Sequence, residues 1–100
     1  TNNTVRGNIV LRSSYNRGHG MGAISLSNTL DGSLVDCDVY DNEVYGPNLY
    51  EGINVVDRNG GVHAEIINNI VQKPADFDAI NPSNTHAETQ VLVEGNLVFE

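Results

Sequence analysis

Apolar and polar residues alternate along four short stretches of the chain, and each stretch contains a central asparagine. The four share the pattern Val/Ile-x-x-Asn-x-Val, and their asparagines are Asn8, Asn42, Asn69 and Asn96. Successive asparagines are 34, 27 and 27 residues apart. Strand-like alternation that recurs with a period of this length indicates a solenoid of stacked repeats.

Alignment on the asparagines predicts the direction of each side chain. Because successive residues of a strand point to opposite faces, apolar columns should face inward and polar columns between them outward. The predicted inward columns are Cys37/Ala64/Val91, Val5/Val39/Ile66/Val93 and Val10/Val44/Val71/Val98, and the predicted outward columns are Asp36/His63/Gln90 and Asp38/Glu65/Leu92.

A second strand recurs upstream, in residues 22–26, 52–55 and 78–82, which align without a gap. Its inward column is Ile24/Ile53/Ile80. Its outward column is the polar stack Ser25/Asn54/Asn81, which we interpret as a candidate ligand-binding surface.

No apolar pattern of helical period is present, and β-branched residues dominate the apolar set. Strands that recur every 27 residues, without helices or hairpins between them, must pair in parallel with their own copies. We therefore predict an all-β fold, a parallel β-helix of about three and a half coils in a single domain over residues 1–100. Both ends interrupt the repeat, which suggests a piece of a longer β-helix.

The recurring asparagine has a structural explanation. A tight bend between two sheets needs a left-handed or bridge backbone conformation, which Asn tolerates. Its amide can also bond the asparagine of the next coil, so that a ladder forms. The residues just before it, Gly7, Asp41, Asn68 and Gly95, are turn residues for the same reason.

The Val-x-[Gly/Asp/Asn]-Asn-x-Val turn and the Gly-Ile-x-Val strand resemble those of right-handed parallel β-helix proteins of the pectin-lyase-like superfamily. The resemblance covers nearly the whole chain. It implies right-handed coils and a secreted or cell-surface protein that binds or acts on acidic polysaccharide. The alternative implied by other members is a structural or adhesive solenoid, such as a tailspike or surface-fibre segment, without catalysis.

Charge narrows the classes of partner. The net charge of −8 argues against nucleic acid, which needs a basic surface. Residues 1–30 contain three arginines and no carboxylate, whereas the rest of the chain holds all 13 Asp and Glu residues. Because Cys37 is the only cysteine, the chain can form neither an internal disulfide nor a Cys-based zinc site. The sequence has no apolar run long enough to predict a membrane-spanning helix.

The first coil departs from the repeat, because residues 12–20 carry about five extra residues relative to later coils. This loop supplies candidate ligand contacts in Arg12 and Tyr15, and candidate catalytic groups in Arg17 and His19. An ordinary polar surface loop is the alternative.

The segment Gly18-His19-Gly20 is similar to an active-site segment of polygalacturonases. That family also needs aspartates upstream and an Arg-Ile-Lys motif downstream, and this sequence contains neither. Whether the chain is an enzyme is left open. An enzyme of this kind would be a polysaccharide lyase or a glycoside hydrolase with an incomplete catalytic set.

Asp36, Asp38 and Glu65 form a dense carboxylate group on the predicted outer face. Like charges stacked on neighbouring strands repel, which gives a cation a reason to bind. Resemblance to β-helix pectate lyases implies Ca²⁺ as a possible ligand there; a solvated acidic surface is the alternative.

The two ends of such a solenoid expose apolar residues, here Val5/Val10 and Val93/Val98. We therefore expect end-to-end or homo-oligomeric packing of the end coils.

Overall fold

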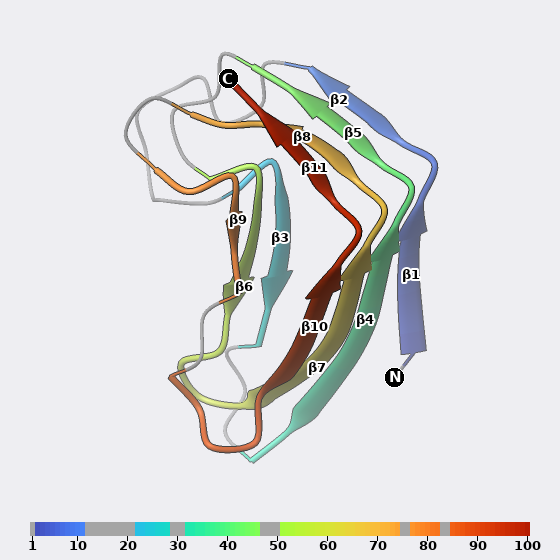
Figure 1. Ribbon diagram of the computed structural model, residues 1–100. Coiled ribbons are helices and arrows are strands. Elements are labelled where there is room, and N and C mark those ends of the chain that lie inside the picture. Colours follow the sequence, from blue (N-terminus) through green and yellow to red (C-terminus); the bar gives the residue numbers. More distant parts are fainter. Residues whose placement is uncertain (1, 12–21, 29–31, 47–50, 75–76, 83–84) are drawn as a thin grey trace.

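The chain folds into three parallel β-sheets that surround a common interior (Figure 1). The computed structural model describes residues 2–11, 22–28, 32–46, 51–74, 77–82 and 85–100, and these contain strands but no helix. The strands are β1 (Asn2–Arg6), β2 (Ile9–Leu11), β3 (Ile24–Ser27), β4 (Leu34–Tyr40), β5 (Glu43–Tyr45), β6 (Ile53–Val56), β7 (Gly61–Ile67), β8 (Ile70–Gln72), β9 (Ile80–Asn81), β10 (Gln90–Glu94) and β11 (Leu97–Phe99). Accordingly, none of the described segments is a helix that could span a membrane.

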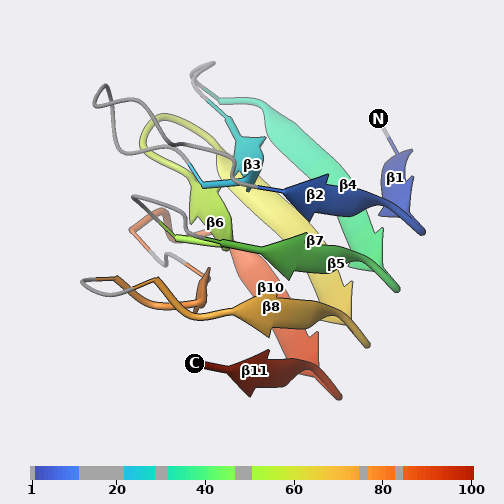
Figure 2. The same cartoon turned by 90° about the horizontal axis from the view of Figure 1, so that it is seen from above.

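Each sheet collects one strand from every coil. Sheet A has the order β1-β4-β7-β10, sheet B the order β2-β5-β8-β11, and sheet C the order β3-β6-β9. The chain visits them in the repeating order A, B, C, so that the coils stack on one another (Figure 2). The fold is thus a parallel β-solenoid, as the period predicted.

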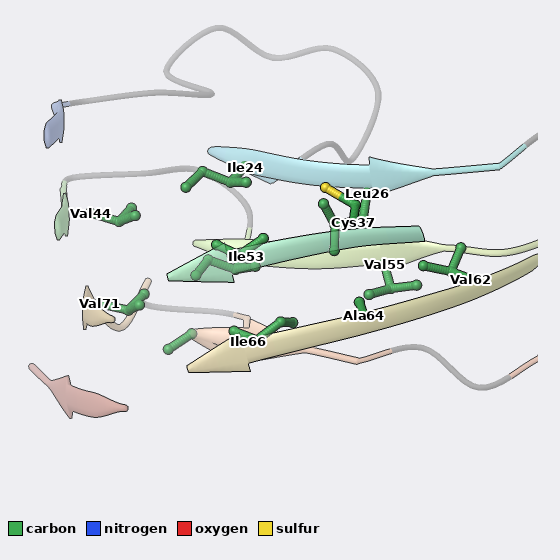
Figure 3. Packing of buried hydrophobic residues seen from close by; sticks show 12 residues of the cluster. Ile24, Leu26, Cys37, Val44, Ile53, Val55, Val62, Ala64, Ile66 and Val71 are labelled. Carbon is green, nitrogen blue, oxygen red and sulfur yellow. The ribbon is translucent and has the colours of Figure 1, made fainter. Parts of the chain in front are cut away.

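The predicted columns are confirmed by the strand registers. Val5 pairs with Val39, Val39 with Ile66, and Ile66 with Val93 along sheet A. Equivalent columns run through sheet B at Val10, Val44, Val71 and Val98, and through sheet C at Ile24, Ile53 and Ile80. The apolar core lies inside these columns (Figure 3).

Burial is deepest in the two middle coils. Val39, Val44, Ile53, Ile66 and Val71 are fully inaccessible to solvent, because they have a coil on each side. Val93 and Val98, in the last coil, remain 41% and 46% exposed. Cys37 is a buried free cysteine within the same core, and burial raises the pKa of its thiol.

The predicted asparagine ladder is present at the bend between sheets A and B. The Nδ2 atoms of Asn8, Asn42 and Asn69 each donate to the Oδ1 atom of the ladder asparagine in the next coil, at 3.1, 3.0 and 2.9 Å. The same oxygens accept the backbone N–H groups of Asn8, Asn42 and Asn69. Asn42 and Asn69 are fully buried, so these bonds satisfy polar groups that water cannot reach.

The left-handed backbone conformation lies one residue before the ladder asparagine. Positive φ angles occur at Gly7 (68°), Asp41 (57°), Asn68 (58°) and Gly95 (67°). Of the two conformations expected at the bend, the left-handed one thus falls on the residues before the ladder asparagines and not on the asparagines themselves, and this confirms the turn role expected for the preceding residues. Glycine has no Cβ to clash there, and Asp and Asn are among the side chains that tolerate the conformation.

Candidate functional site

An open groove runs across the outer face of sheet A and crosses three successive coils. It has a volume of about 550 Å³. The parallel register places one polar side chain of each coil beside the next, since Asp36 pairs with His63 and His63 with Gln90. The residues that line the groove are Asp36, Asp38, His63, Ala64, Glu65, Gln90, Val91 and Leu92.

Each carboxylate in this groove has a partner from another strand. Asp36 Oδ1 lies 3.7 Å from His63 Nδ1, an ion pair whenever the imidazole is protonated. Asp38 Oδ1 accepts the backbone N–H of Glu65 at 3.1 Å. Both contacts join β4 to β7, so they hold neighbouring coils in register as well as lining the groove.

Glu65 turns toward Tyr40 at the end of the groove. The Tyr40 hydroxyl donates to Glu65 Oε1 at 2.5 Å, and this bond is the largest cause that raises the pKa of Tyr40 to about 12. Burial and the negative charges of Asp38 and Glu65 act in the same direction. The Arg6 guanidinium lies over the Tyr40 ring, 5.2 Å from the ring centre, in a cation–π contact.

The three predicted calcium ligands, Asp36, Asp38 and Glu65, all line one groove, but their carboxylates do not surround a common point. Among the described residues, no group of three His, Cys, Asp or Glu side chains is arranged to hold a metal ion. Instead, the carboxylates are engaged with an imidazole, a backbone amide and a phenol. Calcium binding at this face stays a prediction.

The polar stack on the outer face of sheet C has the predicted register, since Ser25 pairs with Asn54 and Asn54 with Asn81. Ser25 Oγ donates to Asn54 Oδ1 at 2.5 Å, and that oxygen also accepts the Gly22 N–H. Asn54 is only 5% exposed, and Asn81 Nδ2 donates to Glu51 Oε1 at 3.2 Å. The stack is therefore less open to a ligand than the alternation alone suggested.

The loop predicted to carry the catalytic and ligand-contacting groups lies outside the described residues. Arg12, Tyr15, Arg17 and His19 all belong to it, so their roles stay predictions.

Sequence reasoning missed a second set of buried polar side chains, at the bend between sheets C and A. Asn28 Nδ2 donates to Gly61 O at 2.9 Å. Asp57, which is 1% exposed, accepts the Thr85 hydroxyl at 2.6 Å and the His86 N–H at 3.0 Å. The sequence does contain a spacing that marks these positions, because Asn28 and Asp57 each follow an inward isoleucine of sheet C by four residues.

The chain matches no protein-family model, and comparisons with curated proteins and with solved structures likewise find no match.

Proposed function

We propose that this chain is a segment of an extracellular, right-handed parallel β-helix that binds polysaccharide. The right-handed coil follows the strong preference of parallel strand connections for that hand. The turn and strand motifs support membership of the pectin-lyase-like superfamily.

The observation that carries the proposal is the groove on sheet A. It is open, it extends over several coils, and it is lined by carboxylate, imidazole and amide groups. Such groups accept and donate hydrogen bonds to hydroxyl groups, and coil-by-coil repetition suits a ligand that is itself a repeating polymer. Leu92, which is 46% exposed, adds apolar surface to the lining.

The charge of the groove selects among polysaccharides. Its lining contains three carboxylates and neither Arg nor Lys. A neutral polysaccharide fits this surface directly, whereas a uronate polymer needs Ca²⁺ to bridge like charges, or contacts from the arginines of residues 12–20. If the ligand is the acidic polysaccharide implied by the family resemblance, its binding to the groove should therefore depend on Ca²⁺ or on the arginines of residues 12–20.

A glycan array with neutral and uronate polysaccharides, probed with and without Ca²⁺, tests this function. The groove variants are Asp38→Asn and Gln90→Ala, the loop variants Arg17→Ala and His19→Ala, and the control is Asp78→Asn, an exposed position outside the groove. We expect the groove variants to weaken binding at least tenfold while the control leaves it unchanged. Binding lost only in the loop variants moves the site to the loop, and no binding to any glycan rejects the function.

The second candidate is a structural or adhesive solenoid without catalysis. It is favoured by the many polar side chains that hydrogen-bond one coil to the next, as in the asparagine ladder and at Asp57. Failure of the glycan array together with a stable, cooperative fold would support it. Under either function the net charge of −8 makes nucleic acid an unfavourable partner, and a secreted or surface location is part of the proposal.

A further inference from the structure

A single asparagine of the chain is followed by glycine, namely Asn59 before Gly60. The pair lies in the bend that joins β6 to β7, outside both strands, and Asn59 is exposed (Figure 1). The Cγ atom of an asparagine can be attacked by the backbone nitrogen of the following residue. Glycine favours this attack, because it has no Cβ to shield the nitrogen or to restrict the backbone.

The backbone nitrogen of Gly60 is available for such an attack. Its neighbours are engaged with other coils, since Gly61 O accepts Asn28 Nδ2 at 2.9 Å and the Val62 N–H donates to Thr89 Oγ1 at 3.2 Å. By contrast, no backbone hydrogen bond between described residues uses the Gly60 N–H, although Gly60 is buried. A buried donor without a partner is costly, and a reaction that removes its hydrogen relieves this cost.

The other asparagines are protected from the same reaction, because none of them precedes a glycine. Asn69 in the ladder is fully buried, and Asn81 precedes Pro82, which has no N–H. Asn68 is the closest comparison, since it is exposed and also lies in a bend, with a φ of 58°. The nitrogen that follows it, however, donates to Asn96 Oδ1 at 2.8 Å.

The bend around Asn59 has little room for a longer backbone. On one side, a Cβ atom added to Gly61 would lie 2.9 Å from Glu88 Cβ of the next coil. On the other side, Asp57 is 1% exposed and accepts the Thr85 hydroxyl at 2.6 Å. A main chain lengthened between these two contacts must displace at least one of them.

We propose that Asn59 is a site of spontaneous deamidation in the folded protein, and that its isoaspartate product loosens the contact between two coils. The Gly60 nitrogen loses its proton to base and bonds to Asn59 Cγ. The Cγ–Nδ2 bond breaks and ammonia leaves, so that a succinimide ring forms.

Water then opens the succinimide at one of its two C–N bonds. Cleavage at Cγ gives aspartate, and cleavage at the main-chain carbonyl gives isoaspartate, whose backbone is one methylene longer. Both products carry a new carboxylate, and the sequence of steps consumes only water. This inference goes beyond polysaccharide binding and is independent of it.

Incubation of the folded chain at mildly alkaline pH, followed by peptide mass spectrometry, tests the modification. Asn59 should convert about tenfold faster than Asn68, because attack at Asn68 must first break the bond of the following N–H. Gly60→Ala should slow the conversion severalfold. Asn59→Gln keeps an amide but needs a larger ring, so conversion at this position should be lost. An Asn59 that stays unmodified, or that converts no faster than Asn68, would overturn the proposal.

Urea unfolding of fresh and incubated chains tests the effect on the coils. The incubated parent chain should unfold at a lower urea concentration than the fresh one, whereas incubated Asn59→Gln should keep its fresh midpoint. Fresh Asn59→Asp is the matched control, because it has the new charge without the added methylene, and it should unfold like the fresh parent. A converted parent chain with an unchanged midpoint, or an Asn59→Asp chain that is equally destabilised, would refute the proposed loosening by isoaspartate.

Discussion

At the scale of single residues, the ladder asparagines combine roles that the repeat alone does not separate. Asn69 accepts two bonds from Asn42 through Oδ1, and its Nδ2 donates both to Val39 O and to Asn96 Oδ1. All of this takes place without solvent access to the Asn69 side chain. One side chain therefore satisfies backbone and side-chain groups of three coils at a position where an unpaired group is costly.

Asn69→Ala should destabilise the chain by roughly 3–5 kcal/mol, because several buried groups lose their partners at once. The matched variant Asn8→Ala removes an exposed end of the same ladder and should cost about 1 kcal/mol or less. Urea unfolding followed by circular dichroism measures both. Equal losses in the two variants would show that burial of the ladder does not determine its contribution.

The hydrogen bond of Tyr40 predicts how its contribution to stability depends on pH. Its hydrogen bond to Glu65 favours the protonated phenol, so the folded pKa, about 12, lies above the usual value of 10. Any stabilisation from this bond is complete below pH 10 and is lost as the pH rises through about 12. Glu65→Gln should lower the pKa of Tyr40, measured as tyrosinate absorbance in difference from Tyr40→Phe. Glu43→Gln, which acts on Tyr45, should leave Tyr40 unchanged.

At the scale of elements, the strands and their registers could be predicted because alternation and period fix them together. Columns such as Val39/Ile66/Val93 need only a correct alignment on the asparagines. Sequence reasoning assigned the bend to the asparagine and to the residue before it without deciding which of the two is left-handed, because both are residue types that tolerate this conformation.

The candidate site was less predictable than the fold. Sequence reasoning placed Asp36, Asp38 and Glu65 on one face, but it could not give the partners that engage them, since those depend on side-chain rotamers. Alternation likewise pointed Asn54 outward without showing that it is covered. The polar bend at Asn28 and Asp57 was missed because its residue type varies from coil to coil.

Gly52 shows how closely sheets B and C approach where the chain enters β6. A Cβ atom added there would overlap Val71 Cγ1 and lie 2.8 Å from Ala79 O, and both neighbours are buried. Gly52→Ala should therefore cost about 1–3 kcal/mol through overpacking. Ser27→Ala, at an exposed position of the adjacent strand, should stay within about 0.5 kcal/mol of the parent in the same urea titration. A Gly52→Ala chain as stable as the parent would mean that these coils can separate without loss.

At the scale of the whole molecule, each coil is stabilised by its neighbours, so stability should decrease from the middle of the solenoid toward its ends. The fully buried residues lie in the two middle coils, while the last coil exposes both Val93 and Val98. Among the described coils, the last one is thus packed less completely than the two middle coils.

Amide hydrogen exchange should report this gradient. The Asn42 amide, bonded to buried Asn69, should exchange only through global unfolding, whereas the Leu97 amide should exchange through fraying of the last coil. The Leu97 amide should therefore exchange faster than the Asn42 amide when both are followed by NMR. Equal exchange rates at the two amides would instead show that the coils unfold together as one cooperative unit.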